Sequence, residues 1–240
     1  MEKMLKNIVE ETNNIVFFGG AGVSTESGIP DFRSESGLYY AQKKYGYSPE
    51  QILSHTFFMT KTKEFYRYYR ENMIYPEARP NPAHRALALL EARGKVKAVV
   101  TQNIDGLHQL AGSQFVYELH GSVHRNSCMR CGSPYTLAEI LESKEEVPLC
   151  HYCGGIIKPE VVLYEVALDD GVVESALEAI RGADVLIVGG TSLSVYPAAG
   201  LLRYFSGREL VLINRTPTDR DKEATLVLHE DIGKVFSEFL

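Results

Sequence analysis

The sequence predicts an α/β protein built on one doubly wound parallel sheet that is interrupted by two insertions. Short, continuous apolar runs alternate with segments of helical periodicity, a pattern typical of parallel strands that are buried on both faces. No internal repeat and no long linker divides the 240 residues. All four cysteines fall within residues 122–157, and aromatic residues crowd residues 34–79, so we expect these two segments to be the insertions.

The elements of the sheet follow from apolar runs and from helix-boundary signals. Buried strands are expected at residues 15–18, 96–101, 185–188 and 210–213, with weaker candidates at 115–118 and 161–163. Helices are expected at the N-terminus and after three N-cap signals, namely Asn81-Pro82, Asp169-Asp170 and Asp231. Apolar residues at helical spacing also predict one helix over residues 58–73 in the first insertion.

Composition and charge exclude several classes of protein. The chain has 25 Lys+Arg against 31 Asp+Glu, and this net charge of −6 argues against broad nonspecific binding to nucleic acid or anionic lipid. No apolar run approaches the roughly 18 residues of a membrane span. The first twelve residues also lack a secretory signal pattern. We therefore expect a cytoplasmic protein whose cysteines are reduced thiols.

The cysteines are spaced as two CxxC pairs, with 18 residues between Cys131 and Cys150. Cys128, Cys131, Cys150 and Cys153 are predicted to bind one zinc ion, because a zinc ribbon uses two such knuckles to present four thiolates. Four thiolates close the coordination sphere, so the zinc is expected to be structural. A redox role for a CxxC pair, and His151 in place of one cysteine, are weaker alternatives.

A glycine turn follows the first predicted strand. Gly20, Ala21 and Gly22 would let the backbone approach a phosphate, and Ser24 and Thr25 add hydroxyl groups. The dehydrogenase fingerprint needs a third glycine where Thr25 stands, and an acid about twenty residues on that is absent, so hydride transfer is disfavoured. A nucleotide-like ligand fits, although a tight turn inside the core remains an alternative.

Polar residues also follow the other predicted strands. Ligands bind beyond the carboxyl ends of parallel strands, so these groups predict a polyhydroxyl ligand that carries phosphate. They are Gly190, Thr191 and Ser192; Asn214 and Arg215; and Gln102, Asn103 and Asp105. Of the seven histidines, His120 at a strand end is best placed for proton transfer and His108 is second.

Several of these stretches together resemble the signature motifs of the sirtuins, the NAD-dependent protein deacylases. They are residues 20–33 (GAGVSTESGIPDFR), 101–108 (TQNIDGLH), 118–121 (ELHG), the two CxxC pairs and 190–193 (GTSL). The motifs occur in the family's order, and the resemblance covers essentially the whole chain. It implies a Rossmann-like large domain of residues 1–33, 80–121 and 158–240. The small domain would combine a helical module (34–79) with a zinc module (122–157).

The resemblance also implies the residues of the site. NAD would contact Gly20, Ala21, Gly22, Ser24, Thr25, Asp31, Phe32, Arg33, Gln102, Asn103, Asp105, Gly190, Thr191, Ser192, Asn214, Arg215, Asp231 and Ile232. The implied catalytic residues are His120, as the base, with Asn103 and Asp105. The implied peptide-binding residues are Val161, Val162 and Tyr164.

The activity implied is NAD-dependent deacetylation of lysine in proteins. The acetyl group moves to ADP-ribose, and nicotinamide and O-acetyl-ADP-ribose are released. NAD is the co-substrate, one zinc is structural, and the partners are acetyl-lysine proteins rather than nucleic acid or membrane. The chain is expected to be a monomer. Mono-ADP-ribosyl transfer and a non-catalytic zinc-ribbon module are the alternatives.

Two features concern substrate choice. In the sirtuin peptide-binding strand a small residue and then an acid are usual, whereas this chain has Glu165 and Val166. Sirtuins that remove succinyl groups pair a Tyr with an Arg three residues later. Here Tyr66 is followed at that spacing by Tyr69, and Arg70 is one position further on, rotated by about 100° on a helix. We therefore expect acetyl groups to be preferred over succinyl groups.

Overall fold

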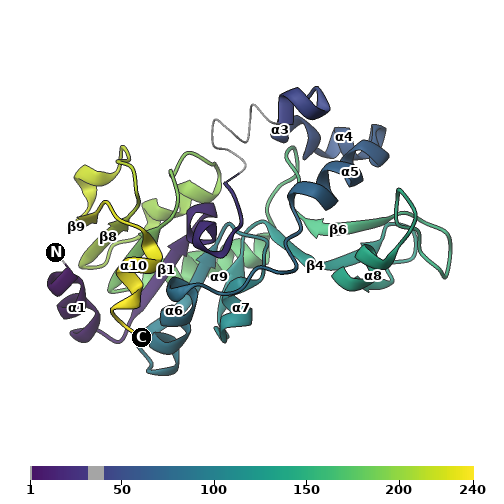
Figure 1. Ribbon diagram of the computed structural model, residues 1–240. Helices are drawn as coiled ribbons and strands as arrows, with labels where there is room; N and C mark the ends of the chain where they lie inside the picture. Colours follow the sequence, from purple (N-terminus) through teal and green to yellow (C-terminus); the bar gives the residue numbers. More distant parts are fainter. Residues whose placement is uncertain (1, 32–40) are drawn as a thin grey trace.

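The structure, a computed structural model, describes residues 2–31 and 41–240. A large body holds a parallel sheet with helices on both faces, and a smaller body holds an antiparallel sheet and several short helices (Figure 1). The predicted α/β class, with its doubly wound sheet and a smaller domain, is confirmed.

The six strands of the large sheet run parallel in the order β3-β2-β1-β7-β8-β9. Their bounds are β1 Ile15–Gly19, β2 Val96–Thr101, β3 Val116–Glu118, β7 Val185–Gly189, β8 Glu209–Ile213 and β9 Leu226–Leu228. Counted along this sheet alone, the order is 3-2-1-4-5-6, which is the Rossmann arrangement. In this arrangement the switch point lies between β1 and β7, so ligands are expected beyond the carboxyl ends of these two strands.

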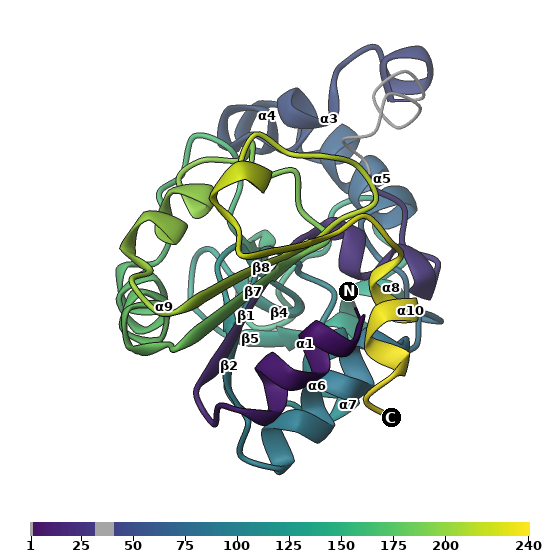
Figure 2. The same ribbon diagram turned by 90° about the vertical axis from the view of Figure 1, so that its left-hand side faces the viewer.

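Helices cover both faces of the sheet (Figure 2). Successive strand residues point to opposite sides, so a continuous apolar run presents apolar side chains to the helices on each face. Phe17 packs with α1 (Glu2–Glu10), α6 (Pro82–Ala92) and α10 (Ile232–Ser237). Phe18 packs with the other group of helices, α9 (Asp170–Gly182) and η3 (Ala198–Tyr204). The continuous apolar run of the first strand is thereby explained.

The smaller body combines the two predicted insertions. Its antiparallel sheet has the order β5-β4-β6, with β4 Gly121–Cys128, β5 Pro134–Thr136 and β6 Ile157–Val161. Its helices are α3 Pro49–Ile52, α4 His55–Thr60, α5 Thr62–Asn72 and α8 Leu137–Glu142. Val123 of β4 and Val161 of β6 pack in one aromatic-rich core with Phe58, Phe65 and Tyr69. This shared core joins the helical and zinc modules.

Several elements differ from the expectation. The strand expected at 161–163 is β6, which ends at Val161 and pairs antiparallel with β4 outside the main sheet. The helix expected over 58–73 breaks at Lys61, where the backbone leaves helical geometry (φ −136°, ψ 50°). Strands β4, β5 and β9 are not among the expected strands.

The short connecting helices are η1 Ala21–Val23, η2 Thr25–Ser27, α7 Leu107–Ala111 and η4 Asp221–Glu223. Within residues 2–31 and 41–240, the structure contains no helix with the length and apolar character needed to cross a bilayer.

Candidate active site and zinc centre

Two glycine turns meet at the switch point of the large sheet. Gly22 donates its N–H to the carbonyl of Gly190 (2.8 Å). A Cβ on Gly22 would lie 2.7 Å from Cα of Gly190, and a Cβ on Gly190, where φ is +61°, would lie 2.3 Å from the nitrogen of Val23. The backbones can approach this closely only without side chains. Such a bare backbone turn is suited to binding phosphate groups.

Polar side chains from the neighbouring strand ends continue this surface. Gln102 Nε2 donates to Thr191 Oγ1 (3.1 Å), and the backbone N–H of Thr191 donates to Asn214 Oδ1 (2.9 Å). Nδ2 of Asn214 is buried and has no hydrogen-bond partner among the described residues. A buried donor without a partner is unfavourable in the empty protein, so this residue fits a ligand that brings a hydrogen-bond acceptor. A nucleotide has such acceptors.

The start of α10 lies beside the same edge of the sheet. Asp231 occupies the N-cap position, but its side chain does not cap the helix as expected; it forms an ion pair with Arg215 instead. Glu26 satisfies the helix terminus, accepting a hydrogen bond from the Gly233 N–H (2.6 Å). Sequence reasoning missed Glu26 because 207 positions separate it from its partner. Ile232 is buried with its Cδ1 close to Gly189.

His120 lies in the two-residue turn between β3 and β4 and is partly buried. Its Nδ1 lies 2.9 Å from the backbone carbonyl of Gln102. A carbonyl oxygen only accepts, so Nδ1 carries the hydrogen and the neutral ring has its lone pair on Nε2. This fixed tautomer is what a general base requires.

Asp105 is held from two sides. The hydroxyl of Ser24 donates to its Oδ2 (2.7 Å), and the N–H of Leu107 donates to its Oδ1 (2.9 Å). Asn103 Nδ2 donates in turn to the Ser24 oxygen (3.1 Å). Burial raises the pKa of Asp105 above its ordinary value, although both hydrogen bonds act in the opposite direction.

A buried histidine that sequence reasoning missed stands behind this network. The N–H of Asn81 donates to Nδ1 of His84 (3.3 Å), so the hydrogen of the neutral ring lies on Nε2, which faces the Ser24 oxygen at 3.5 Å. Burial lowers the pKa of His84 to about 4. His108, the second candidate for chemistry, is fully buried against His84, and neither of its ring nitrogens has a hydrogen-bond partner among the described residues.

A cavity of about 570 Å³ lies between the two bodies. The predicted site residues that line it are Ala21, Ser24, Gln102, Asn103, Asp105, His120, Val161, Val162 and Tyr164. The expected base and the expected peptide segment therefore face one space. Phe32 and Arg33 lie outside the described residues, whereas Asp31 is partly buried just before them.

The remaining predicted residues lie along the same strand ends. Thr25 donates its hydroxyl to the carbonyl of Gly22 (3.0 Å) and so stabilises the glycine turn. Gly20 packs against Thr191, whose Cβ would be 2.8 Å from a Cβ on the glycine. Ser192 hydrogen-bonds Ser194 (2.7 Å).

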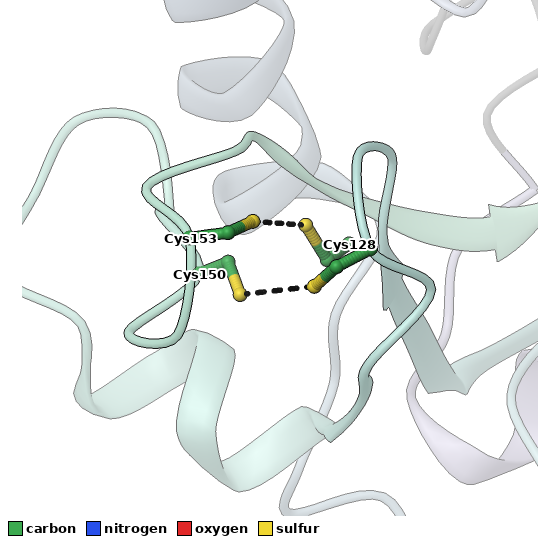
Figure 3. Close-up of side chains that lie close together, drawn as sticks. Cys128, Cys150 and Cys153 are labelled. Atoms are coloured by element: carbon green, nitrogen blue, oxygen red, sulfur yellow. Dashed lines mark hydrogen bonds between the residues drawn. The ribbon is translucent and has the colours of Figure 1, made fainter.

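The four cysteines converge between the knuckles of the zinc module (Figure 3). Their Sγ atoms all lie within 4.8 Å of one another, with Cys128–Cys153 at 3.5 Å and Cys131–Cys150 at 3.6 Å. A disulfide needs about 2.05 Å, whereas thiolates around tetrahedral zinc lie about 3.8 Å apart. The four sulfur atoms therefore fit one zinc ion.

Comparisons with known proteins agree with this geometry. The model of the Sir2 family matches residues 20–197. An NAD-dependent protein deacetylase of Clostridium acetobutylicum is 60% identical over 231 residues, which is 96% of this chain and 94% of that protein. One of Clostridium perfringens is 58% identical over 98% of this chain and 97% of that protein.

Solved structures are similar over almost the whole chain. One described as Sir2 with a p53 peptide and NAD+ has a TM-score of 0.89 at 38% identity and covers 99% of this chain and 96% of its own. One described as a Sir2 variant with deacetylated p53 peptide and 3′-O-acetyl-ADP-ribose has a TM-score of 0.88 at 39% identity, with the same coverage.

Proposed function

The chain belongs to the Sir2 family and is an NAD-dependent protein deacetylase, and we propose that His120 is its catalytic base. The enzyme transfers the acetyl group of acetyl-lysine to ADP-ribose and releases nicotinamide and O-acetyl-ADP-ribose. The observation that carries the proposal is the fixed tautomer of His120. Its Nδ1–H is bound to the Gln102 carbonyl, so that Nε2 is the basic nitrogen at a cavity that the peptide segment also lines.

Other residues bind and orient the substrates in this proposal. When bound, NAD supplies the ADP-ribose acceptor and the nicotinamide leaving group. The glycine turns at Gly22 and Gly190 hold its phosphates, while Asn214 takes the adenosine half. Asn103 and Asp105 position the ribose and the carboxamide of the nicotinamide half. Both side chains hydrogen-bond the Ser24 hydroxyl, which holds them in place. His120 then accepts a proton from a ribose hydroxyl at Nε2.

The four cysteines hold zinc in a structural role in this proposal. Four thiolates leave no coordination position for water or substrate. None of the four lines the large cavity within the described part of the chain. We further propose that the enzyme acts in the cytoplasm as a monomer on acetylated proteins, and binds neither nucleic acid nor membrane.

His120→Ala tests the proposal. We expect kcat for an acetyl-lysine peptide to fall about 10³-fold, within the range typical of a lost general base. The dissociation constant of NAD should change by less than about threefold. The His120 side chain contacts the Gln102 carbonyl and not the glycine turns that we propose to hold the NAD phosphates. Phe115→Ala, which truncates an exposed ring outside the cavity, is the control.

Mass spectrometry of the products separates this activity from ADP-ribosyl transfer. O-acetyl-ADP-ribose should form only when both NAD and acetylated peptide are present. Unchanged turnover in the His120 variant would reject the base, and ADP-ribose attached to protein without deacetylation would reject the reaction.

A further inference from the structure

Glu165 has a backbone conformation that is unusual for its residue type. Its φ is +75°, and among the described non-glycine residues only Leu193 shares a positive φ. The left-handed region is unfavourable for a residue with a Cβ and is common only for glycine. Other contacts must therefore hold Glu165 in place.

The side chain of Glu165 makes such a contact with the helical module. Its Oε2 accepts a hydrogen bond from the backbone N–H of Thr56 (2.9 Å), in the first turn of α4. Hydrogen bonding from Thr56, first from its side chain and then from this N–H, lowers the pKa of Glu165, so the group is ionised and the bond is charge-assisted. The N–H of Phe57 donates to the Ser54 hydroxyl oxygen (3.1 Å). The two contacts together satisfy two backbone N–H groups in the first turn of α4.

Backbone hydrogen bonds join the residues before Glu165 to the same module. Tyr164 donates to the carbonyl of Leu53 and accepts from the N–H of His55, both at 3.0 Å. Two residues earlier, Val162 donates to the carbonyl of His120 (2.9 Å). One edge of this extended segment is therefore hydrogen-bonded to the helical module and to the backbone carbonyl of His120.

The opposite edge of the segment faces the space where a peptide would lie. Backbone groups of an extended chain alternate in direction, so Leu163 presents its N–H away from the edge used by Val162 and Tyr164. Residues 162–165 all line the same cavity as His120. The Leu163 carbonyl on this edge already accepts from the N–H of Val166 (3.2 Å), so an extended peptide can add through a main-chain hydrogen bond from the Leu163 N–H.

We propose that Glu165 is a positioning residue that holds segment 162–165 in the conformation to which an acetyl-lysine peptide adds. The inference rests on the proposed deacetylase function. A segment ordered in advance loses less conformational entropy when the peptide binds. The contact with Thr56 therefore affects peptide binding, and it affects neither the NAD turns nor the proton transfer at His120.

Three substitutions separate the carboxylate from the backbone strain. Glu165→Gly removes both the contact and the strain, and glycine adopts the left-handed region without penalty. Glu165→Gln keeps an acceptor oxygen but loses the charge. Glu165→Ala loses the contact and keeps the strain. Glu160→Gln, an exposed acid on β6 without contact to α4, is the matched control.

Steady-state kinetics with an acetyl-lysine peptide give the first readout. We expect KM for the peptide to rise about tenfold in Glu165→Gly, more in Glu165→Ala, and less than threefold in Glu165→Gln. KM for NAD and kcat should stay within twofold of the wild type, and the Glu160 control should match the wild type. An unchanged peptide KM in Glu165→Gly, or an equal rise in KM for NAD, would overturn the inference.

Hydrogen exchange without substrate gives a readout independent of activity. The amides of Thr56 and Tyr164 should exchange at least tenfold faster in Glu165→Gly than in the wild type. Equal exchange would also overturn the inference. A wild-type protein without NAD-dependent deacetylation would instead reject the proposed function, so the two failures are distinguishable.

Discussion

Single residues in this protein owe their chemistry to a buried hydrogen-bond network. Asn81 fixes the tautomer of His84, which faces Ser24, and Ser24 gives its hydrogen to Asp105. A separate carbonyl, that of Gln102, fixes the tautomer of His120. The residue types were visible in the sequence, but these directions of hydrogen bonding depend on which backbone group each ring meets.

The buried histidines predict a stability that depends on pH. The pKa of His84 is about 4 in the folded chain, whereas an exposed histidine titrates near 6.5. Between these values the unfolded chain binds more protons, so the free energy of unfolding should fall as pH is lowered from about 6.5 towards 4. When the pH is lowered from 7 to 5, the titration of His84 should lower the free energy of unfolding by about 2 kcal/mol. Burial shifts the pKa of His108 in the same direction.

Urea unfolding at pH 7 and pH 5 measures this effect. In His84→Asn the loss of stability on acidification should be smaller by about 2 kcal/mol than in the wild type, because asparagine does not titrate. The same loss in both proteins would show that His84 does not carry the effect.

The cap of one helix could be predicted from the sequence, whereas the cap of another could not. The N-cap of α6 at Asn81 was predictable, because the side chain bonds its own helix, accepting from Ala83 N–H (2.9 Å). The cap of α10 was not, because its donor Gly233 is satisfied by Glu26 from a distant segment. Local contacts leave a pattern in the sequence, and long-range contacts leave none.

The zinc knuckles are elements whose stability should depend on every ligand. The hydrophobic cluster around them is small, with Tyr135, Ile140 and Ile157 as its buried apolar residues besides the cysteines. Cys131→Ala leaves three thiolates, so we expect the variant to lose zinc and to unfold or aggregate. Met129→Ala, an exposed residue of the same knuckle, should keep both zinc and fold.

Zinc content by mass spectrometry of metals and melting followed by circular dichroism check this expectation. A folded Cys131→Ala protein that melts like the wild type and binds NAD normally would show that the site is not structural.

At the scale of the whole molecule, the cavity lined by His120 lies between the two bodies. Val123 of β4 donates to the carbonyl of Ile104 (3.0 Å), and His124 Nε2 donates to that of Asp105 (2.9 Å). The small antiparallel sheet therefore holds the loop that carries Asp105. Both bodies therefore shape the cavity.

Acyl preference is the prediction that belongs to this scale. Arg70 turns towards the zinc module, where it donates to the carbonyls of Glu145 (3.0 Å) and Ile140 (3.4 Å), and Arg67 lies over the ring of Tyr45. Neither arginine lines the cavity, and Arg125, which does line it, is already ion-paired with Glu118 (2.7 Å). A succinyl carboxylate would be desolvated without these arginines as partners, so kcat/KM for acetyl-lysine should exceed that for succinyl-lysine by at least about 100-fold. Comparable values on matched peptides would contradict the prediction.

The sequence by itself predicted the α/β class with its parallel sheet, the grouping of the four cysteines, and His120 as the base that we propose. Apolar runs, CxxC spacing and short motifs are local patterns, and each reflects a requirement of its own segment. Only the tertiary structure showed that β6 leaves the main sheet, that Asp231 pairs with Arg215 rather than capping α10, and that Glu165 reaches Thr56. These contacts join residues far apart in the chain, and their energies depend on packing that no local pattern encodes.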